Sequence, residues 1–157
     1  MPMWEGRTDM LQRARATFAL AVAASFVASF MFAATALATG APISTTMTGT
    51  QEVPGPGDPD GSGTAVLRLN PGKGQICYTL TVSGIGDPIA AHIHQAPPGV
   101  AGPVVVPLAA PVDGSSNACA TVAKDLIKAI LLHPEDYYVN VHNIDFPAGA
   151  IRGQLSR

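Results

Sequence analysis

The 157-residue sequence has few charged and few aromatic side chains, and it contains only two cysteines. Charged residues make up 13% of the chain, and the formal net charge is -2 at pH 7. A dedicated nucleic-acid-binding protein needs a basic surface to neutralise phosphates, so this composition argues against that class. The low charge does not indicate disorder either, because 47% of the residues are hydrophobic. We therefore expect one folded domain that binds no nucleic acid.

Common catalytic motifs are also missing from the sequence. It has no G-x-S-x-G nucleophile elbow, no phosphate-binding loop and no G-x-G-x-x-G dinucleotide motif. The segment 58–61 (Asp-Pro-Asp-Gly) resembles the start of a calcium loop but lacks the later ligands of an EF-hand, so we interpret it as a turn. These absences favour a protein that is not an enzyme.

The N-terminal region has the features of an export signal. Three arginines precede an uncharged apolar run at 16–37, which ends in the small residues that signal peptidase recognises. We predict a signal peptide at 1–38, cleaved after Ala38, and a single domain at 39–157. The alternative is an uncleaved membrane anchor, because the run approaches the ~20 residues that span a bilayer. Cleavage would leave an exported protein, periplasmic or extracellular, that does not contact the membrane.

The rest of the chain alternates apolar and polar residues with a period of two, which is typical of half-buried strands. The full sequence has 16 glycines and 14 prolines, which favour short strands joined by turns. One segment, Asp125–Leu132, has helical periodicity instead. We predict an all-β fold, an antiparallel Greek-key β-sandwich or barrel of the immunoglobulin or Cu/Zn superoxide dismutase type, with one short helix. The expected strands are Ile43–Thr48, Thr64–Asn70, Gln75–Ser83, Ile89–His94, 103–106, Asn117–Val122, Tyr137–His142 and Ala150–Leu155.

Both cysteines follow the predicted signal peptide. Cys77 and Cys119 each lie on a predicted strand, on the same side as neighbouring threonines and opposite the apolar residues. An even cysteine count in an exported protein indicates a disulfide, and two such strands can be bridged across that side. We predict a Cys77–Cys119 bond, with two free thiols as the alternative.

Several motifs, in order along nearly all of 39–157, resemble the CHRD family. They are Gly49–Pro54, the A-H-I-H segment 91–94 followed by Gly102–Val106, Tyr137–His142 and Ile151–Leu155. The family is named after chordin, an extracellular antagonist of bone morphogenetic proteins, and has many exported microbial members. The resemblance implies a fold and an extracytoplasmic location rather than an activity.

The histidines are the strongest candidates for a functional site. His92 and His94 are two residues apart on one predicted strand, so both side chains project from the same face. His142 lies on another strand, on the side opposite Val139 and Val141. If the two strands are neighbours, three neutral imidazoles converge and suit one Zn²⁺ or Cu²⁺ ion. A dinuclear dismutase site is not expected, because it needs further histidine and aspartate ligands. The competing interpretation is that these histidines only hydrogen-bond to backbone carbonyls and hold a loop in place.

Other polar and aromatic residues have simpler interpretations. Tyr137 and Tyr138 are adjacent on a strand, so we expect one in the core and the other exposed as a contact. Arg152 and Gln154 share one strand face, which we expect to be solvated, although it could form a recognition surface. His133 follows the predicted helix and is expected to complement its dipole.

Two functions remain open at this point. The first is an exported, non-enzymatic binding or structural module that acts on a protein or envelope partner. The second is a mononuclear copper or zinc protein that uses His92, His94 and His142 and has redox activity if the metal is copper.

Overall fold

The structure, a computed structural model, describes residues 42–157. The predicted signal peptide at 1–38 and its cleavage site lie outside the described residues. Within 42–157, no helix is long and apolar enough to cross a membrane.

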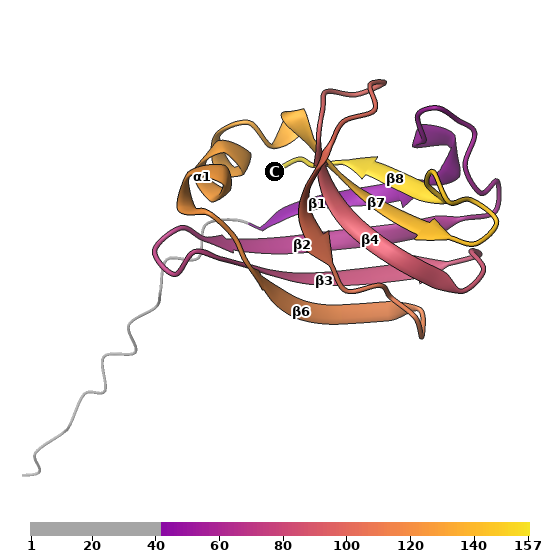
Figure 1. The fold of residues 1–157 in the computed structure, drawn as a ribbon, viewed down its shortest axis with the longest axis horizontal. Helices are drawn as coiled ribbons and strands as arrows, with labels where there is room; N and C mark the ends of the chain where they lie inside the picture. Colours follow the sequence, from indigo (N-terminus) through magenta and orange to yellow (C-terminus); the bar gives the residue numbers. More distant parts are fainter. Residues whose placement is uncertain (1–41) are drawn as a thin grey trace, which may run out of the picture. The chain divides into compact units, whose positions relative to one another are not determined.

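Eight antiparallel strands form one strongly curved, barrel-like sheet (Figure 1). Their order is β5-β4-β7-β8-β1-β2-β3-β6, and all the strand pairs are antiparallel. The predicted all-β fold with one short helix is confirmed. The strands are β1 (Ile43–Thr48), β2 (Ser62–Asn70), β3 (Gln75–Ser83), β4 (Pro88–Gln95), β5 (Val104–Leu108), β6 (Ser115–Thr121), β7 (Tyr137–Asn143) and β8 (Ile151–Gln154).

The two edge strands, β5 and β6, approach each other without forming a ladder within 42–157. Hydrogen bonds link the connection between them to the sheet: the Tyr78 hydroxyl of β3 accepts the Ala109 N–H at 2.7 Å, and the Ser116 hydroxyl of β6 donates to the Ala109 carbonyl at 2.8 Å. The sheet is therefore nearly closed.

The core fills the interior of the barrel with the alternate residues of each strand. This is the expected result of a period of two, since every second side chain points inward. At 25–30 cal/mol per Å², such burial is the main stabilising contribution to the fold. Fully buried members include Leu67, Ile76, Leu80, Ile93, Val139, Val141 and Ile151.

The helix α1 (Lys124–Leu132) closes one end of the barrel. Ile127 and Ile130 are fully buried, whereas Asp125 and Lys128 face solvent and form an exposed ion pair at 3.2 Å. The helix ends before Pro134, which begins the short 3-10 turn η2 (Pro134–Asp136). The predicted helix is confirmed with its start one residue earlier.

The Cys77–Cys119 disulfide is present, as predicted. The two residues lie directly opposite each other on β3 and β6. The bond ties the edge strand β6 to the sheet. Disulfides persist in oxidising compartments, so this one indicates such a setting for the domain.

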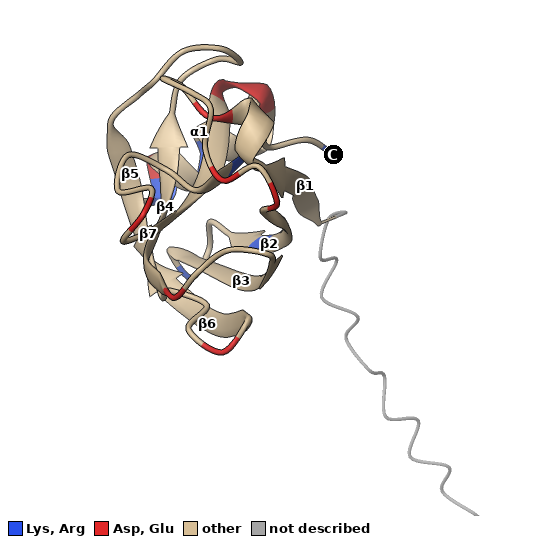
Figure 2. Cartoon of the chain, turned by 90° about the vertical axis from the view of Figure 1, so that its right-hand side faces the viewer, with Lys and Arg blue, Asp and Glu red and all other residues tan. Residues whose placement is uncertain are grey.

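Charged residues are unevenly distributed over the fold (Figure 2). Every acidic residue of the described chain lies in a connection or a helical segment, and none lies on a strand. The predicted turn at 58–61 is confirmed, since the Asp58 carboxylate accepts the Asp60 N–H at 3.2 Å. Among residues 42–157, two arginines lie on strands: Arg68 on β2 is exposed, whereas Arg152 on β8 is 2% exposed.

Candidate metal centre

The candidate site lies on the outer face of three neighbouring strands, β4, β7 and β8. His92 on β4 is opposite Asn140 on β7, and Asn140 is opposite Arg152 on β8. These side chains point away from the core, because the residues that alternate with them are the buried apolar ones. All seven residues of β7 are nevertheless buried. The outer face of this part of the sheet is therefore covered, and the cover consists of loops.

The three predicted histidines come together on this face. His92 and His94 lie on β4, and His142 lies on the adjacent β7, as the sequence interpretation required. The Nδ1 of His92 is 3.1 Å from the Nε2 of His142. One ring nitrogen from each of the three residues lies within 4.8 Å of the other two. His133, the fourth histidine, is not part of the cluster and instead approaches Glu135, with 3.5 Å between Nδ1 and Oε1.

Backbone carbonyls fix the orientation of two of the three rings. The Nδ1 of His94 lies 2.9 Å from the Gly102 carbonyl oxygen, and the Nδ1 of His142 lies 3.2 Å from that of Pro147. A carbonyl oxygen only accepts hydrogen bonds, so both Nδ1 atoms carry the proton and both Nε2 atoms keep a lone pair. The Nε2 of His142 accepts the Nδ1–H of His92, whereas the Nε2 of His94 is buried without a partner.

The surroundings of the cluster favour neutral imidazoles. Burial lowers the pKa of His92, His94 and His142, because a charged ring loses hydration. The nearby histidines lower the pKa of His92 and His142 further, since a second positive charge would be repelled. Neutral imidazole is the form that binds metal ions.

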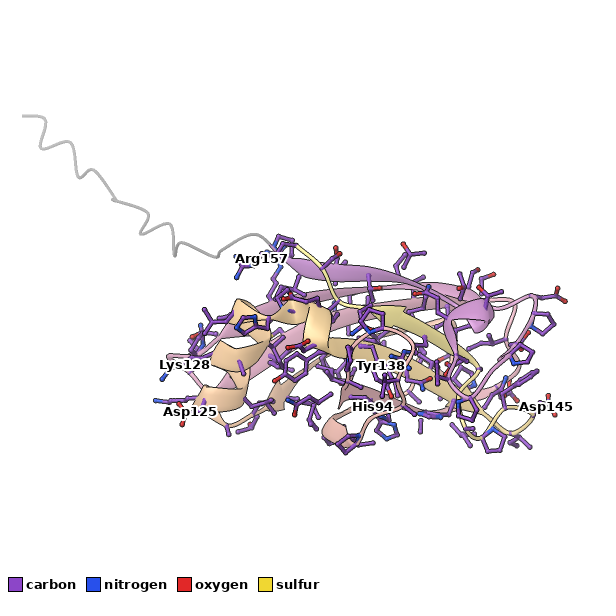
Figure 3. All side chains as sticks on the ribbon, turned by 90° about the horizontal axis from the view of Figure 1, so that it is seen from above. His94, Asp125, Lys128, Tyr138, Asp145 and Arg157 are labelled. Atoms are coloured by element: carbon purple, nitrogen blue, oxygen red, sulfur yellow. A yellow bond between two sulfur atoms is a disulfide. The ribbon has the colours of Figure 1, made fainter. Side chains whose placement is uncertain are left out.

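Tyr138 on β7 packs against His94 of this cluster (Figure 3). The Tyr138 ring stacks on His94, with 4.8 Å between ring centroids and 13° between ring planes. Its hydroxyl accepts the Gly102 N–H at 3.0 Å. The prediction that one of the two tyrosines is exposed is wrong, because Tyr137 and Tyr138 are 3% and 2% exposed. The reason is that the connection between β4 and β5 covers the outer face of β7.

Arg152 lies beside Tyr138 under the same connection. Its guanidinium carbon is 3.4 Å from the centroid of the Tyr138 ring, a cation–π contact. It also donates hydrogen bonds to the carbonyl oxygen of Pro97 and the side chain of Gln154, both at 3.3 Å. Gln154 donates to the Ala96 carbonyl at 2.9 Å. The expectation of a solvated face at Arg152 is therefore wrong, since the loop that contains Ala96 and Pro97 covers this side chain and accepts hydrogen bonds from Arg152 and Gln154.

Glu52 is a functional candidate that the sequence interpretation missed. It directly follows the 3-10 turn η1 (Gly49–Gln51) and is 5% exposed. The Asn140 side chain donates to its Oε2 at 3.3 Å. Burial raises the pKa of Glu52 to about 7, although the positive charge of Arg152 and the bond from Asn140 act in the opposite direction. The only sequence signal was the position of this acid within the family-like segment 49–54.

The comparison with known families agrees with the resemblance found in the sequence. A family model, the CHRD domain, matches residues 43–155, which extends from the first residue of β1 to just beyond β8. No curated protein and no solved structure matches the chain significantly. The family match covers well over half of the sequence, including the histidine cluster and Glu52. The chain therefore belongs to the CHRD domain family.

Proposed function

We propose that this CHRD domain is an exported metal-binding module in which His92, His94 and His142 hold one Zn²⁺ or Cu²⁺ ion. The observation that best supports the proposal is the pair of hydrogen bonds from Nδ1 of His94 and of His142 to backbone carbonyls. Histidines that bind metals usually donate their second ring nitrogen in this way, which fixes the ring and its tautomer.

The spacing of the nitrogens is close to what one ion needs. Zinc–nitrogen distances are ~2.0–2.1 Å, so two nitrogens on one tetrahedral ion are about 3.4 Å apart. The 3.1 Å between His92 and His142 is already close to this spacing. The widest pair, at up to 4.8 Å, needs a closure of up to roughly 1.4 Å, which rotation of the side chains would supply on binding. The ion would replace the proton that His92 now donates to His142.

The chemistry of the donors limits the choice of metal. Three neutral imidazoles suit Zn²⁺ and Cu²⁺ better than Ca²⁺ or Mg²⁺, which prefer oxygen ligands. Three protein ligands leave a fourth position for water or an external group. Copper would give the domain a redox-active centre, whereas zinc would only polarise the fourth ligand.

Two independent features support the export part of the proposal. The N-terminal sequence has the pattern of a signal peptide, and the domain carries a disulfide of the kind that persists in oxidising compartments. The full chain should be produced in a bacterial host and the exported product sequenced from its N-terminus. We expect the product to begin at Thr39. A product that starts at Met1 and stays in the cytoplasm would contradict export.

A second candidate function is a non-enzymatic binding or structural module for a protein or envelope partner. The same two hydrogen bonds support it, because they attach His94 and His142 to the loops that cover β7. In that case the histidines stabilise the loops and bind no ion. The two functions differ in what the loss of a histidine changes, either metal affinity or stability alone.

A metal titration distinguishes the two functions. The purified, metal-free product of the full chain is titrated with Zn²⁺ and with Cu²⁺ in a calorimeter, in parallel with His142→Ala and with His133→Ala. His133 is the matched control, since it is an exposed histidine outside the cluster. We expect one ion per chain at micromolar affinity or tighter, a loss of at least about a hundredfold in His142→Ala, and no change in His133→Ala. Binding that is weaker than micromolar, or that His142→Ala leaves unchanged, would contradict the proposal.

A further inference from the structure

The Glu52 side chain is buried on the outer face of the sheet, enclosed by neighbouring backbone segments. The segment 49–58 folds back on β8, and its Asp58 N–H donates to the Ala150 carbonyl at 2.8 Å. Gly57 and Gly149 lie so close to Glu52 that a Cβ at either position would collide with its side chain. The carboxyl group therefore has no room to swing out into solvent without moving these backbone segments.

One side chain separates this carboxyl group from the histidine cluster. Asn140 donates to Oε2 of Glu52 and is the cross-strand neighbour of His92. Directly opposite residues on antiparallel strands have Cβ atoms ~4.5–5.5 Å apart. Glu52 is thus connected to the histidine cluster through Asn140.

Few charges surround Glu52. On β8 it faces Arg152, on β7 it faces the neutral Asn140, and the adjoining segments 53–58 and 147–150 contribute mainly backbone. The positive charge of Arg152 acts to lower the pKa of Glu52, but the two side chains form no ion pair within 4.0 Å in the described chain. One polar atom of each of Glu52, Asn140 and Arg152 is buried without a hydrogen-bond partner. The carboxylate is therefore not neutralised by a direct partner.

We infer that Glu52 is the buried counter-charge of the metal centre, and that its ionised carboxylate strengthens the binding of a divalent cation to the histidines. This inference rests on the proposed metal site. A cation placed at the cluster favours the charged form of a nearby buried carboxyl group. By linkage, ionised Glu52 raises the affinity for the cation by the same factor.

The coupling between Glu52 ionisation and cation binding acts over a defined pH range. The pKa of Glu52 is about 7 in the metal-free protein, so at neutral pH the group is about half protonated. Cation binding drives this proton into solvent. The affinity of the site for the cation therefore continues to rise as the pH increases through 7. This rise lies above the pH range in which the three histidines lose their protons, because their pKa values are lowered.

The test compares Glu52→Gln with the parent protein and with Glu135→Gln, using Zn²⁺ alone as the ligand. Glutamine keeps the shape of the side chain and removes its charge, and Glu135 is an exposed acid of η2. At pH 8 we expect Zn²⁺ affinity to fall about tenfold in Glu52→Gln and to be unchanged in Glu135→Gln. At pH 5.5, where Glu52 is protonated, the parent and Glu52→Gln should bind alike.

A measurement on the parent protein keeps the inference testable if Glu52→Gln does not fold. Calorimetry at pH 7 in two buffers of different ionisation enthalpy counts the protons released, and we expect about 0.5 proton from Glu52 per ion. Release of no proton, or equal Zn²⁺ affinity of Glu52→Gln and parent at pH 8, overturns this inference while leaving the metal site in place. A parent protein that binds no Zn²⁺ overturns both.

Discussion

The two sides of the barrel bury their outer faces very differently. On β3 the residues alternate, and Thr79, Thr81 and Ser83 are exposed while the residues between them are buried. On β7 every residue is buried, including the polar Asn140 and His142. The side formed by β2, β3 and β6 is an ordinary half-exposed sheet. The side formed by β4, β7 and β8 carries a second, polar layer beneath loops.

This difference indicates which side of the barrel carries the function. A strand buried on both faces is normally apolar on both, because a buried polar group without a partner costs roughly 1–3 kcal/mol. The covered side nevertheless retains a glutamate, an arginine and histidines, and several of their polar atoms lack partners. Such a layer lowers the stability of the fold unless a bound ligand pairs with its polar atoms. The open side has stability as its main requirement, and it carries the disulfide.

The disulfide should have the largest effect on stability. In Cys77→Ser/Cys119→Ser, the unfolded chain regains the freedom of a 42-residue separation. We expect the free energy of unfolding to fall by about 4 kcal/mol. Urea denaturation measures this change. Because the disulfide lies on the open side, Zn²⁺ affinity of the folded variant should match that of the parent, and a matching loss of affinity would show that the two sides are not separate.

Two arginines test the contrast between the sides directly. In Arg152→Ala the buried Glu52 loses its only charged neighbour in the described chain, and the Pro97 carbonyl loses a donor. We expect the free energy of unfolding to fall by about 3 kcal/mol, because the cation–π contact with Tyr138 is lost and buried acceptors lose their donor. In Arg68→Ala, on the open side, the change should stay within about 0.5 kcal/mol, since this side chain is exposed. Equal effects in urea denaturation would contradict the comparison.

The pH dependence of stability provides a third test. The pKa of Glu52 is raised from 4.5 to about 7, so between these values the folded protein keeps a proton that the unfolded chain has released. Its contribution to stability is therefore full below pH 4.5 and is lost as the pH rises through 7. Relative to Glu52→Gln, the metal-free parent should lose about 2 kcal/mol between pH 5 and pH 8. Parallel curves for the two proteins would show that Glu52 titrates normally.

The smallest expected effect concerns two tyrosine hydroxyl groups, one on the covered side of the barrel and one on the open side. Tyr138→Phe removes the acceptor of the Gly102 N–H, and Tyr78→Phe removes that of the Ala109 N–H. Each should lower unfolding free energy by about 1 kcal/mol. Only Tyr138→Phe should also weaken Zn²⁺ binding, by a few-fold, because Gly102 orients His94. Calorimetry would contradict this if both variants bound Zn²⁺ alike.

The open side was predictable from sequence because alternation reports directly on a half-buried strand. The apolar residues of 75–83 and the shared face of Cys77 and Cys119 were enough to place β3, β6 and the bond between them. The convergence of His92, His94 and His142 was also predictable, since it required only that two strands be neighbours. Alternation determines which residues share a face, and that was sufficient here.

The covered side was not predictable in the same way. A period of two does not show whether water or a loop covers a polar face, so Arg152 and one of the two tyrosines, Tyr137 and Tyr138, were expected to be exposed. Glu52 precedes the rest of the site by 40 residues or more in the sequence and lies on no strand. Its proximity depends on the backbone path of 49–58, which depends on contacts with Gly57 and Gly149. Such long-range contacts leave no periodic pattern.

X-ray absorption at the zinc edge of the Zn²⁺-loaded protein tests the central claim most directly. The account predicts three imidazole nitrogens at ~2.0–2.1 Å and one further light atom. In His94→Ala the number of imidazole ligands should fall to two. A spectrum dominated by oxygen ligands, or one that His94→Ala does not change, would contradict the claim that the covered side of the barrel is a metal centre.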